Sequence, residues 1–132
     1  MSVKITGVQE FKKQINNILL ARIKKAERAA TIIGLKVKGD AVRLAPNDLG
    51  NLRGSAYSRI ENNLGVVSAL VGFSAEYALY VHEDLEMKTK GQGVKRPKNR
   101  GTRWDNGESK FLEKAVIRNR EFIRKTIKES QQ

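Results

Sequence analysis

A helical pattern from residue 8 to residue 44 constrains the fold of this chain more than any other feature. Apolar residues recur there mostly in steps of three and four, as in one face of a helix: Phe11, Ile15, Ile18, Leu19, Ile23, Ala26, Ala30, Ile33, Val37, Ala41 and Leu44. We expect Pro46 to end this helix, because the residue before a proline is pushed out of helical geometry.

The length of this helix limits how it can be packed. An unbroken helix over 8–44 would be about 55 Å long at about 1.5 Å per residue. A compact domain of 132 residues has a radius of gyration of only ~14 Å. The helix must therefore bend, most easily at Gly34 or Gly39, or project from the body of the protein.

The other periodic segments predict strands and a second helix. Val3 and Ile5 alternate with polar residues and suggest a short first strand. Residues 55–61 and 66–73 predict two antiparallel strands joined by a turn at 62–65. Ser74 is a candidate N-cap for a short helix that carries Tyr77 and Tyr80.

From residue 109 to about residue 129, the sequence predicts a final helix whose inner face carries Leu112, Val116, Ile123 and Ile127. The expected fold is α+β, a single domain over residues 1–132. In it a long N-terminal helix and a C-terminal helix pack on a small antiparallel β-sheet, with a long basic loop at 83–108.

Composition narrows the classes of function. The chain has 26 Lys and Arg against 14 Asp and Glu, a net charge of +12 that favours polyanions or acidic protein surfaces as neighbours. The absence of cysteine excludes disulfide scaffolds and thiolate metal sites. No apolar run approaches the ~20 residues that span a bilayer. We expect a soluble, non-secreted protein.

The loop at 83–108 is the strongest candidate for contact with a polyanion or a neighbouring subunit. Its acidic start is followed by basic residues and one tryptophan: Lys88, Lys90, Lys95, Arg96, Lys98, Arg100, Arg103 and Trp104. The basic residues would neutralise phosphates and Trp104 would stack on a base. The alternatives are that the loop is simply solvated, or that it docks onto an acidic neighbour.

Signs of catalysis are weak. The single histidine, His82, lies among acids without the second histidine of a zinc-protease helix, and we expect it to be solvated. Glu83, Asp84 and Glu86 lack companions that would complete a cation site. We therefore expect no enzyme activity, no cofactor and no metal.

The segment after Pro46 forms a marked corner, with Asp48, Gly50, Leu52 and Arg53 in quick succession. Its first role is to end a helix and begin a strand. Gly50 is expected to adopt a backbone conformation that is costly for other residues. We expect Arg53 to pair with a carboxylate such as Glu83, within one subunit or between two.

The order of these motifs resembles a family of tailed-bacteriophage proteins encoded among head-to-tail joining genes, the neck or tail-completion proteins. Residues 45–55 match the family's Ala-Pro corner and its Gly-x-Leu-Arg-x-Ser segment. Val71-Gly72 and then 77–83 match a strand followed by Tyr-Ala-x-Tyr-Val and an acidic residue, here His82-Glu83 after Val81. Phe111-Leu112 matches the opening of the family's final helix.

Two departures concern the loop. Many relatives continue with Gly-Thr and a short loop ending in Pro-Phe-Leu, whereas this chain has Asp84-Leu85-Glu86, a longer basic loop, and Lys110 in the place of the proline.

The resemblance implies a structural virion protein, made in the bacterial host cytoplasm and assembled as an oligomeric ring at the portal–tail junction. Its expected neighbours are further copies of itself and portal-adaptor or tail-terminator proteins, with non-specific contact to genomic DNA and none to membrane. The corner and interface residues that it implies are Pro46, Asp48, Gly50, Leu52, Arg53, Tyr77, Tyr80 and Glu83. The alternative is a cytoplasmic nucleic-acid-binding module that uses residues 88–104.

Overall fold

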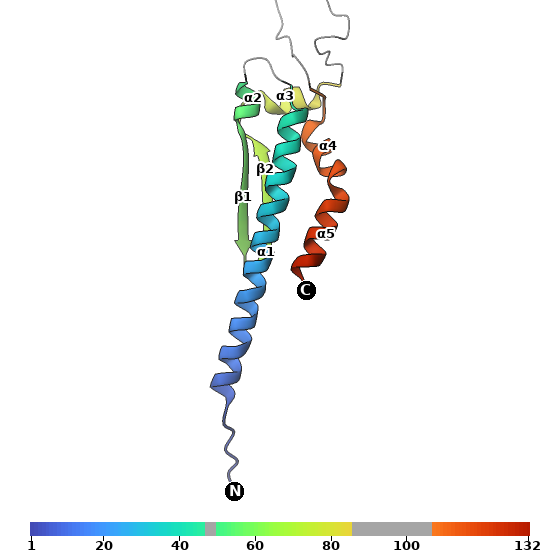
Figure 1. Cartoon of the computed structure of the whole chain (residues 1–132). Helices are drawn as coiled ribbons and strands as arrows, with labels where there is room; N and C mark the ends of the chain where they lie inside the picture. The colour runs from blue at the N-terminus through green and yellow to red at the C-terminus, as the bar shows by residue number, and fades with distance from the viewer. Residues whose placement is uncertain (47–49, 86–106) are drawn as a thin grey trace, which may run out of the picture.

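A computed structural model describes residues 1–46, 50–85 and 107–132, and it confirms a mixed fold of helices and an antiparallel sheet. The elements are α1 (Val8–Leu44), α2 (Asn51–Gly54), β1 (Ala56–Asn63), β2 (Val66–Phe73), α3 (Ala78–Glu83), α4 (Phe111–Arg118) and α5 (Arg120–Ser130). Figure 1 shows α1 as the central rod, with the β1–β2 hairpin along one side and α4 and α5 along the other.

Helix α1 runs unbroken for 37 residues. Of the two expected arrangements, a bent helix or a projecting one, the structure shows the projecting helix. Its N-terminal part extends beyond both the hairpin and the end of α5 (Figure 1). Gly34 serves packing instead of a bend, because a Cβ built there would lie 2.4 Å from Oγ of Ser58 on β1. The missing side chain at Gly34 therefore lets the sheet approach the helix.

Pro46 ends α1 as predicted. Ala45 has extended backbone angles (φ −64°, ψ 137°) directly before the proline, and its N–H still bonds the carbonyl of Ala41. Ala45 and Pro46 are both fully buried, so the end of the helix is enclosed by the rest of the fold.

The hairpin pairs Ala56 with Phe73 at one end and Asn63 with Val66 at the other. Leu64 and Gly65 form the two-residue turn, with φ of 52° and 86°. Two consecutive positive φ angles give a turn whose twist suits paired strands. Asn62 stabilises it by accepting a hydrogen bond from the N–H of Gly65, and β1 reaches two residues further than the sequence indicated.

The core lies near the C-terminal end of α1. One cluster joins the corner to α3 and α4 through Ala45, Leu52, Ala78, Val81 and Phe111. A second cluster joins α1 to α4 through Val37, Ala41 and Ala115, with residues of β2 and α5 packed against it. Both clusters lie far from the N-terminus of α1, so that end contributes little to the core.

The expectation of a first strand at Val3 and Ile5 is wrong. Residues 1–7 form neither helix nor strand, and the sheet of the described residues contains only β1 and β2. Two alternating residues cannot hold a strand that has no partner to bond with. Ser74 is also not a cap: α3 begins after Tyr77, and the Ser74 hydroxyl donates to the carbonyl of Ser55.

The predicted final helix is divided at Asn119 into α4 and α5. Its inner face follows steps of four through Phe111, Ala115, Asn119 and Ile123. The prediction that Val116 lies inside is wrong, since 46% of it is exposed. Leu112 and Ile123 do pack against the core, whereas Ile127 lies at the exposed end of α5, beyond the core.

Candidate functional site

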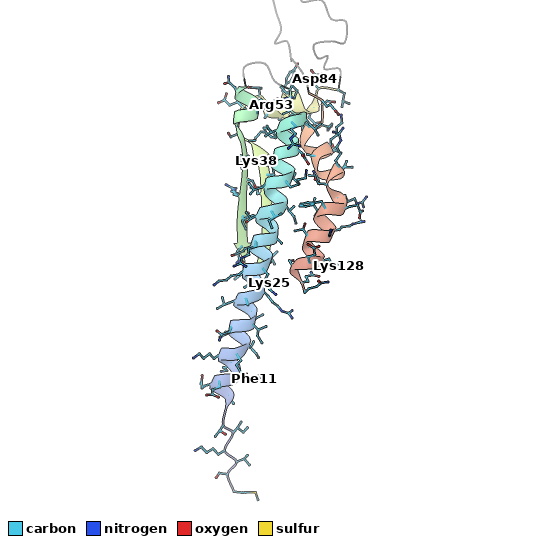
Figure 2. The ribbon with its side chains drawn as sticks, in the orientation of Figure 1. Phe11, Lys25, Lys38, Arg53, Asp84 and Lys128 are labelled. Carbon is cyan, nitrogen blue, oxygen red and sulfur yellow. The ribbon has the colours of Figure 1, made fainter. Side chains whose placement is uncertain are left out.

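The corner residues converge on the end of α1. Leu52 is buried in the core cluster beside Ala45, and Gly50 has φ 82°, as the sequence predicted. Figure 2 shows Arg53 and Asp84 at this same end of the molecule. Asp48 lies outside the described residues.

Arg53 binds the main chain at the end of α1. Its Nε donates to the carbonyl of Ala45 at 2.9 Å, and its Nη2 donates to the carbonyl of Arg43 at 3.3 Å. The last carbonyls of a helix lack partners within the helix, and they carry partial negative charge. A guanidinium satisfies both needs, so Arg53 acts as a side-chain cap for α1.

The segment before α4 seals the same helix end. The N–H of Glu108 bonds the carbonyl of Leu44 at 2.8 Å. Gly107 has φ 121°, and a Cβ built there would lie 2.5 Å from both N and Cα of Pro46. Gly107 is therefore a corner residue that the sequence reasoning missed, and only the contact across the fold reveals it.

Glu83 pairs with residues other than Arg53. Nζ of Lys110 forms an ion pair with Oε2 of Glu83, and Nδ1 of His82 lies 2.9 Å from Oε1. Lys110, followed by His82, lowers the pKa of Glu83 below its ordinary value, and Glu83 in turn raises the pKa of Lys110. Within one chain, the expected Arg53–Glu83 pair is not formed, because Arg53 binds carbonyls at the end of α1 and Glu83 binds Lys110 and His82. A pair between two subunits stays a prediction.

His82 is largely enclosed, which corrects the expectation of a solvated residue. Its ring meets that of Phe111 edge-on, with centroids 5.0 Å apart. Its Nε2 is buried and has no hydrogen-bond partner among the described residues. The signal in the sequence was its spacing, since His82 follows the buried Ala78 by one helical step of four.

Tyr77 and Tyr80, which match the family motif, are not buried with the residues at the end of α1. Tyr77 is partly exposed and Tyr80 is 76% exposed, beside the exposed Leu79. The buried residues of α3 are Ala78 and Val81. The tyrosines therefore lie on the surface, where a neighbouring molecule has access to them.

A polar bridge holds α1 to the final helices. Nδ2 of Asn119 donates to Oδ2 of Asp40 at 2.7 Å and lies 2.8 Å from the carbonyl of Ala115. Asn119 first, and then Lys36, hold the pKa of Asp40 below its ordinary value. Asn119 is the buried polar residue at the break between α4 and α5.

The projecting part of α1 carries an apolar stripe on its surface. We call residues 8–22 the arm; every residue in it is exposed. Its stripe consists of Val8, Phe11, Ile15 and Ile18, at helical spacing. Phe11 is 62% exposed, and Figure 2 shows it well away from the hairpin and α5. Such an array normally lies against another surface.

A groove begins where the arm meets the body. Its walls come from α1, from the turn end of β2 and from the end of α5: Ile18, Leu19, Ile23, Ala26, Ala30, Val67, Ala69, Ile123 and Ile127. Arg22 and Lys25 also line it. The groove and the arm share Ile18, so they form one continuous apolar surface.

No group of three or more His, Cys, Asp or Glu side chains within residues 1–46, 50–85 and 107–132 is placed to hold a metal ion. Within those same ranges, no helix is long and apolar enough to cross a membrane. Glu86 and the whole predicted polyanion contact, from Lys88 to Trp104, lie outside the described residues.

Comparisons with protein-family models, curated proteins and solved structures give no significant match for this chain.

Proposed function

We propose that this chain is a structural, non-enzymatic protein of a tailed-phage virion, and that it forms part of an oligomeric ring at the head–tail junction. The observation that supports it best is the arm of α1, which presents Val8, Phe11, Ile15 and Ile18 without a partner in the described chain. The resemblance of the sequence motifs to neck and tail-completion proteins is the reason to propose a head–tail junction as the assembly.

The shape suits assembly more than binding of a small substrate. A ring needs one surface on each subunit and a different, complementary surface on its neighbour. The arm extends beyond the body, while α3 lies at the opposite end of the molecule (Figure 1). Helix α3 exposes Leu79 and Tyr80. The chain thus presents two separate apolar surfaces: the one at α3 would serve the contact between copies in the ring, and the arm would serve a contact with a neighbouring protein of another kind.

The corner would set the direction of the arm. Arg53, Gly107 and Glu108 fix the far end of α1 against α2 and α4. A helix held firmly at one end presents its other end at a fixed distance and angle. That geometry is what a repeated contact around a ring requires.

The test uses phage in which this gene carries a nonsense mutation, grown in hosts that do and do not suppress it. We expect separate full heads and separate tails in electron micrographs of the non-suppressed lysate. Supplying the wild-type chain from a plasmid restores joined particles, and supplying Phe11→Ser, Ile15→Ser does not. Normal particles without the chain would refute the proposal.

A second candidate function rests on the charge of +12 and on the run of basic residues from Lys88 to Arg103 beside Trp104. In this alternative the chain is a cytoplasmic nucleic-acid-binding module. It predicts binding to short duplexes at micromolar protein that weakens steeply with salt. Replacing Lys95, Arg96, Lys98 and Arg100 by serine would then abolish binding; unchanged binding would exclude this loop as the contact.

A further inference from the structure

The arm stripe continues along α1 directly into the groove. Steps of three and four lead from Phe11 through Ile15, Ile18 and Arg22 to Ala26, and then on to Ala29 and Ile33. The second half of this line lies along the groove between β2 and α5, whereas the first half lies on the exposed arm. A single elongated object could therefore cover the arm and enter the groove.

The floor of the groove consists of small side chains, which would let another helix approach closely. Ala26, Ala29 and Ala30 line it on α1, between β2 on one side and α5 on the other. Small side chains let a second helix approach closely and let its larger side chains fill the space above them. A groove with an alanine floor and isoleucines on its walls suits an amphipathic helix.

The positive charge of Arg22 determines which kind of helix can bind in the groove. Arg22 is the one charged member of the line between Phe11 and Ile33, and no carboxylate of the described residues pairs with it. Lys12 is likewise unpaired within the described chain, and Lys25 reaches only the carbonyl of Gln132. Covering Arg22 with an apolar surface would leave a charge desolvated without a partner, which is strongly unfavourable. The occupant must bring a carboxylate to it.

The same charges oppose a second copy of this chain as the occupant. The arm contains one acid, Glu10, against Lys12, Lys13 and Arg22, and Glu10 lies off the stripe. Two arms packed together would bring six basic side chains side by side with two acids, neither of which lies on the stripe. A flat anionic membrane would match the charge, but it would not enter a groove walled by β2 and α5.

We propose that the arm stripe and the groove together bind an amphipathic helix of another protein, whose apolar face is flanked by acidic residues and whose carboxylate pairs with Arg22. This inference rests on the proposed role of the arm as an assembly contact and names the chemistry of its partner. It does not require that the partner belong to a virion.

The probe is a synthetic 18-residue helical peptide with leucines on one face and glutamates on both flanks, labelled for fluorescence anisotropy. A second peptide has lysines in place of the glutamates. With the full-length chain, we expect saturable binding of the acidic peptide that weakens as salt is added, and little binding of the basic one. Binding of neither peptide, or equal binding of both, would overturn the proposal.

Charge reversal supplies the decisive variant and its control. Arg22→Glu should weaken binding of the acidic peptide by about tenfold or more and improve binding of the basic one, since it reverses a buried charge pair. Lys24→Glu makes the same change of charge on another side of the same helix, where Lys24 lies outside the groove. It should bind nearly as the wild type does; an equal loss in both variants would reduce the effect to net charge.

Two further measurements test whether a second copy of this chain or a membrane covers the arm instead. A dimer in sedimentation that Phe11→Ser abolishes would show that a second copy covers the arm. Flotation with phosphatidylserine vesicles, without peptide binding, would show a membrane instead. Either result overturns the inference. If the peptide binds as expected but phage without the chain assemble normally, the virion role fails and the helix-binding surface stands.

Discussion

Arg53 reaches back eight residues along the chain to donate a hydrogen bond of 2.9 Å from Nε to the carbonyl of Ala45, the residue that ends α1. A second bond joins the same guanidinium to the carbonyl of Arg43. Because α1 is the element on which the sheet, α4 and α5 all pack, this contact fixes the corner to the central rod of the molecule.

We expect Arg53→Ala to lower the free energy of unfolding by about 1–3 kcal/mol, because it removes the charged donor from the buried Ala45 carbonyl and from the exposed carbonyl of Arg43. Arg53→Lys should recover only part of the loss, since an ammonium cannot reach two carbonyls with the geometry of a guanidinium. Urea denaturation measures both variants. Equal stability of Arg53→Ala and the wild type would show that the helix end does not need this cap.

Gly107→Ala should destabilise the fold by about 1–3 kcal/mol or more, since it adds a Cβ against the backbone of Pro46 at a strained positive φ. Gly54→Ala is the matched control, because a Cβ at Gly54 meets nothing within 4 Å. The control should be neutral or slightly stabilising. Thermal unfolding compares them, and a Gly107→Ala protein as stable as the control would argue against the tight contact with Pro46.

Two phenylalanines should behave in opposite ways. Phe111 is 1% exposed and contacts both Phe73 and His82, so Phe111→Ala should cost about 3–5 kcal/mol of stability. Phe11→Ala on the arm should change the stability of the isolated chain by less than about 0.5 kcal/mol. A large loss from Phe11→Ala would mean that the arm is packed within its own chain.

The Asp40–Asn119 bridge should make stability depend on pH in the acidic range. The folded state lowers the pKa of Asp40, through Asn119 first and Lys36 second. The bridge therefore stabilises the fold above the ordinary carboxyl pKa of ~4, and this contribution is lost as the pH falls through the lower folded value. Asp40→Asn does not titrate, so its disadvantage against the wild type should shrink between about pH 5 and pH 2. A disadvantage that is constant over this range would exclude the bridge as the source.

The sequence predicted the long helix, its end at Pro46 and the hairpin because local rules determine them. Helical spacing, the geometry before proline and the turn preference of residues 62–65 act within a few positions. The positive φ of Gly50 was predicted for the same reason. These features need no knowledge of distant parts of the chain.

The sequence did not predict the features that depend on contacts between distant parts of the chain. Arg53 donates to main-chain carbonyls, which no side-chain pattern reveals. Asn119, where the last helix divides, bonds Asp40, 79 positions away. Counting only large apolar residues placed Val116 inside, whereas the small Ala115 and the polar Asn119 occupy that face.

The proposed virion role of this chain is tested most directly by imaging the head–tail junction of the phage particles in which we expect it. Cryo-electron microscopy of that junction should show a ring of density into which α1, the hairpin and the final helices fit repeatedly. In each copy, the surface of Phe11 and Ile15 should lie against a neighbouring protein. Particles whose junction lacks this density, or a ring in which the arm points into solvent, would contradict the account.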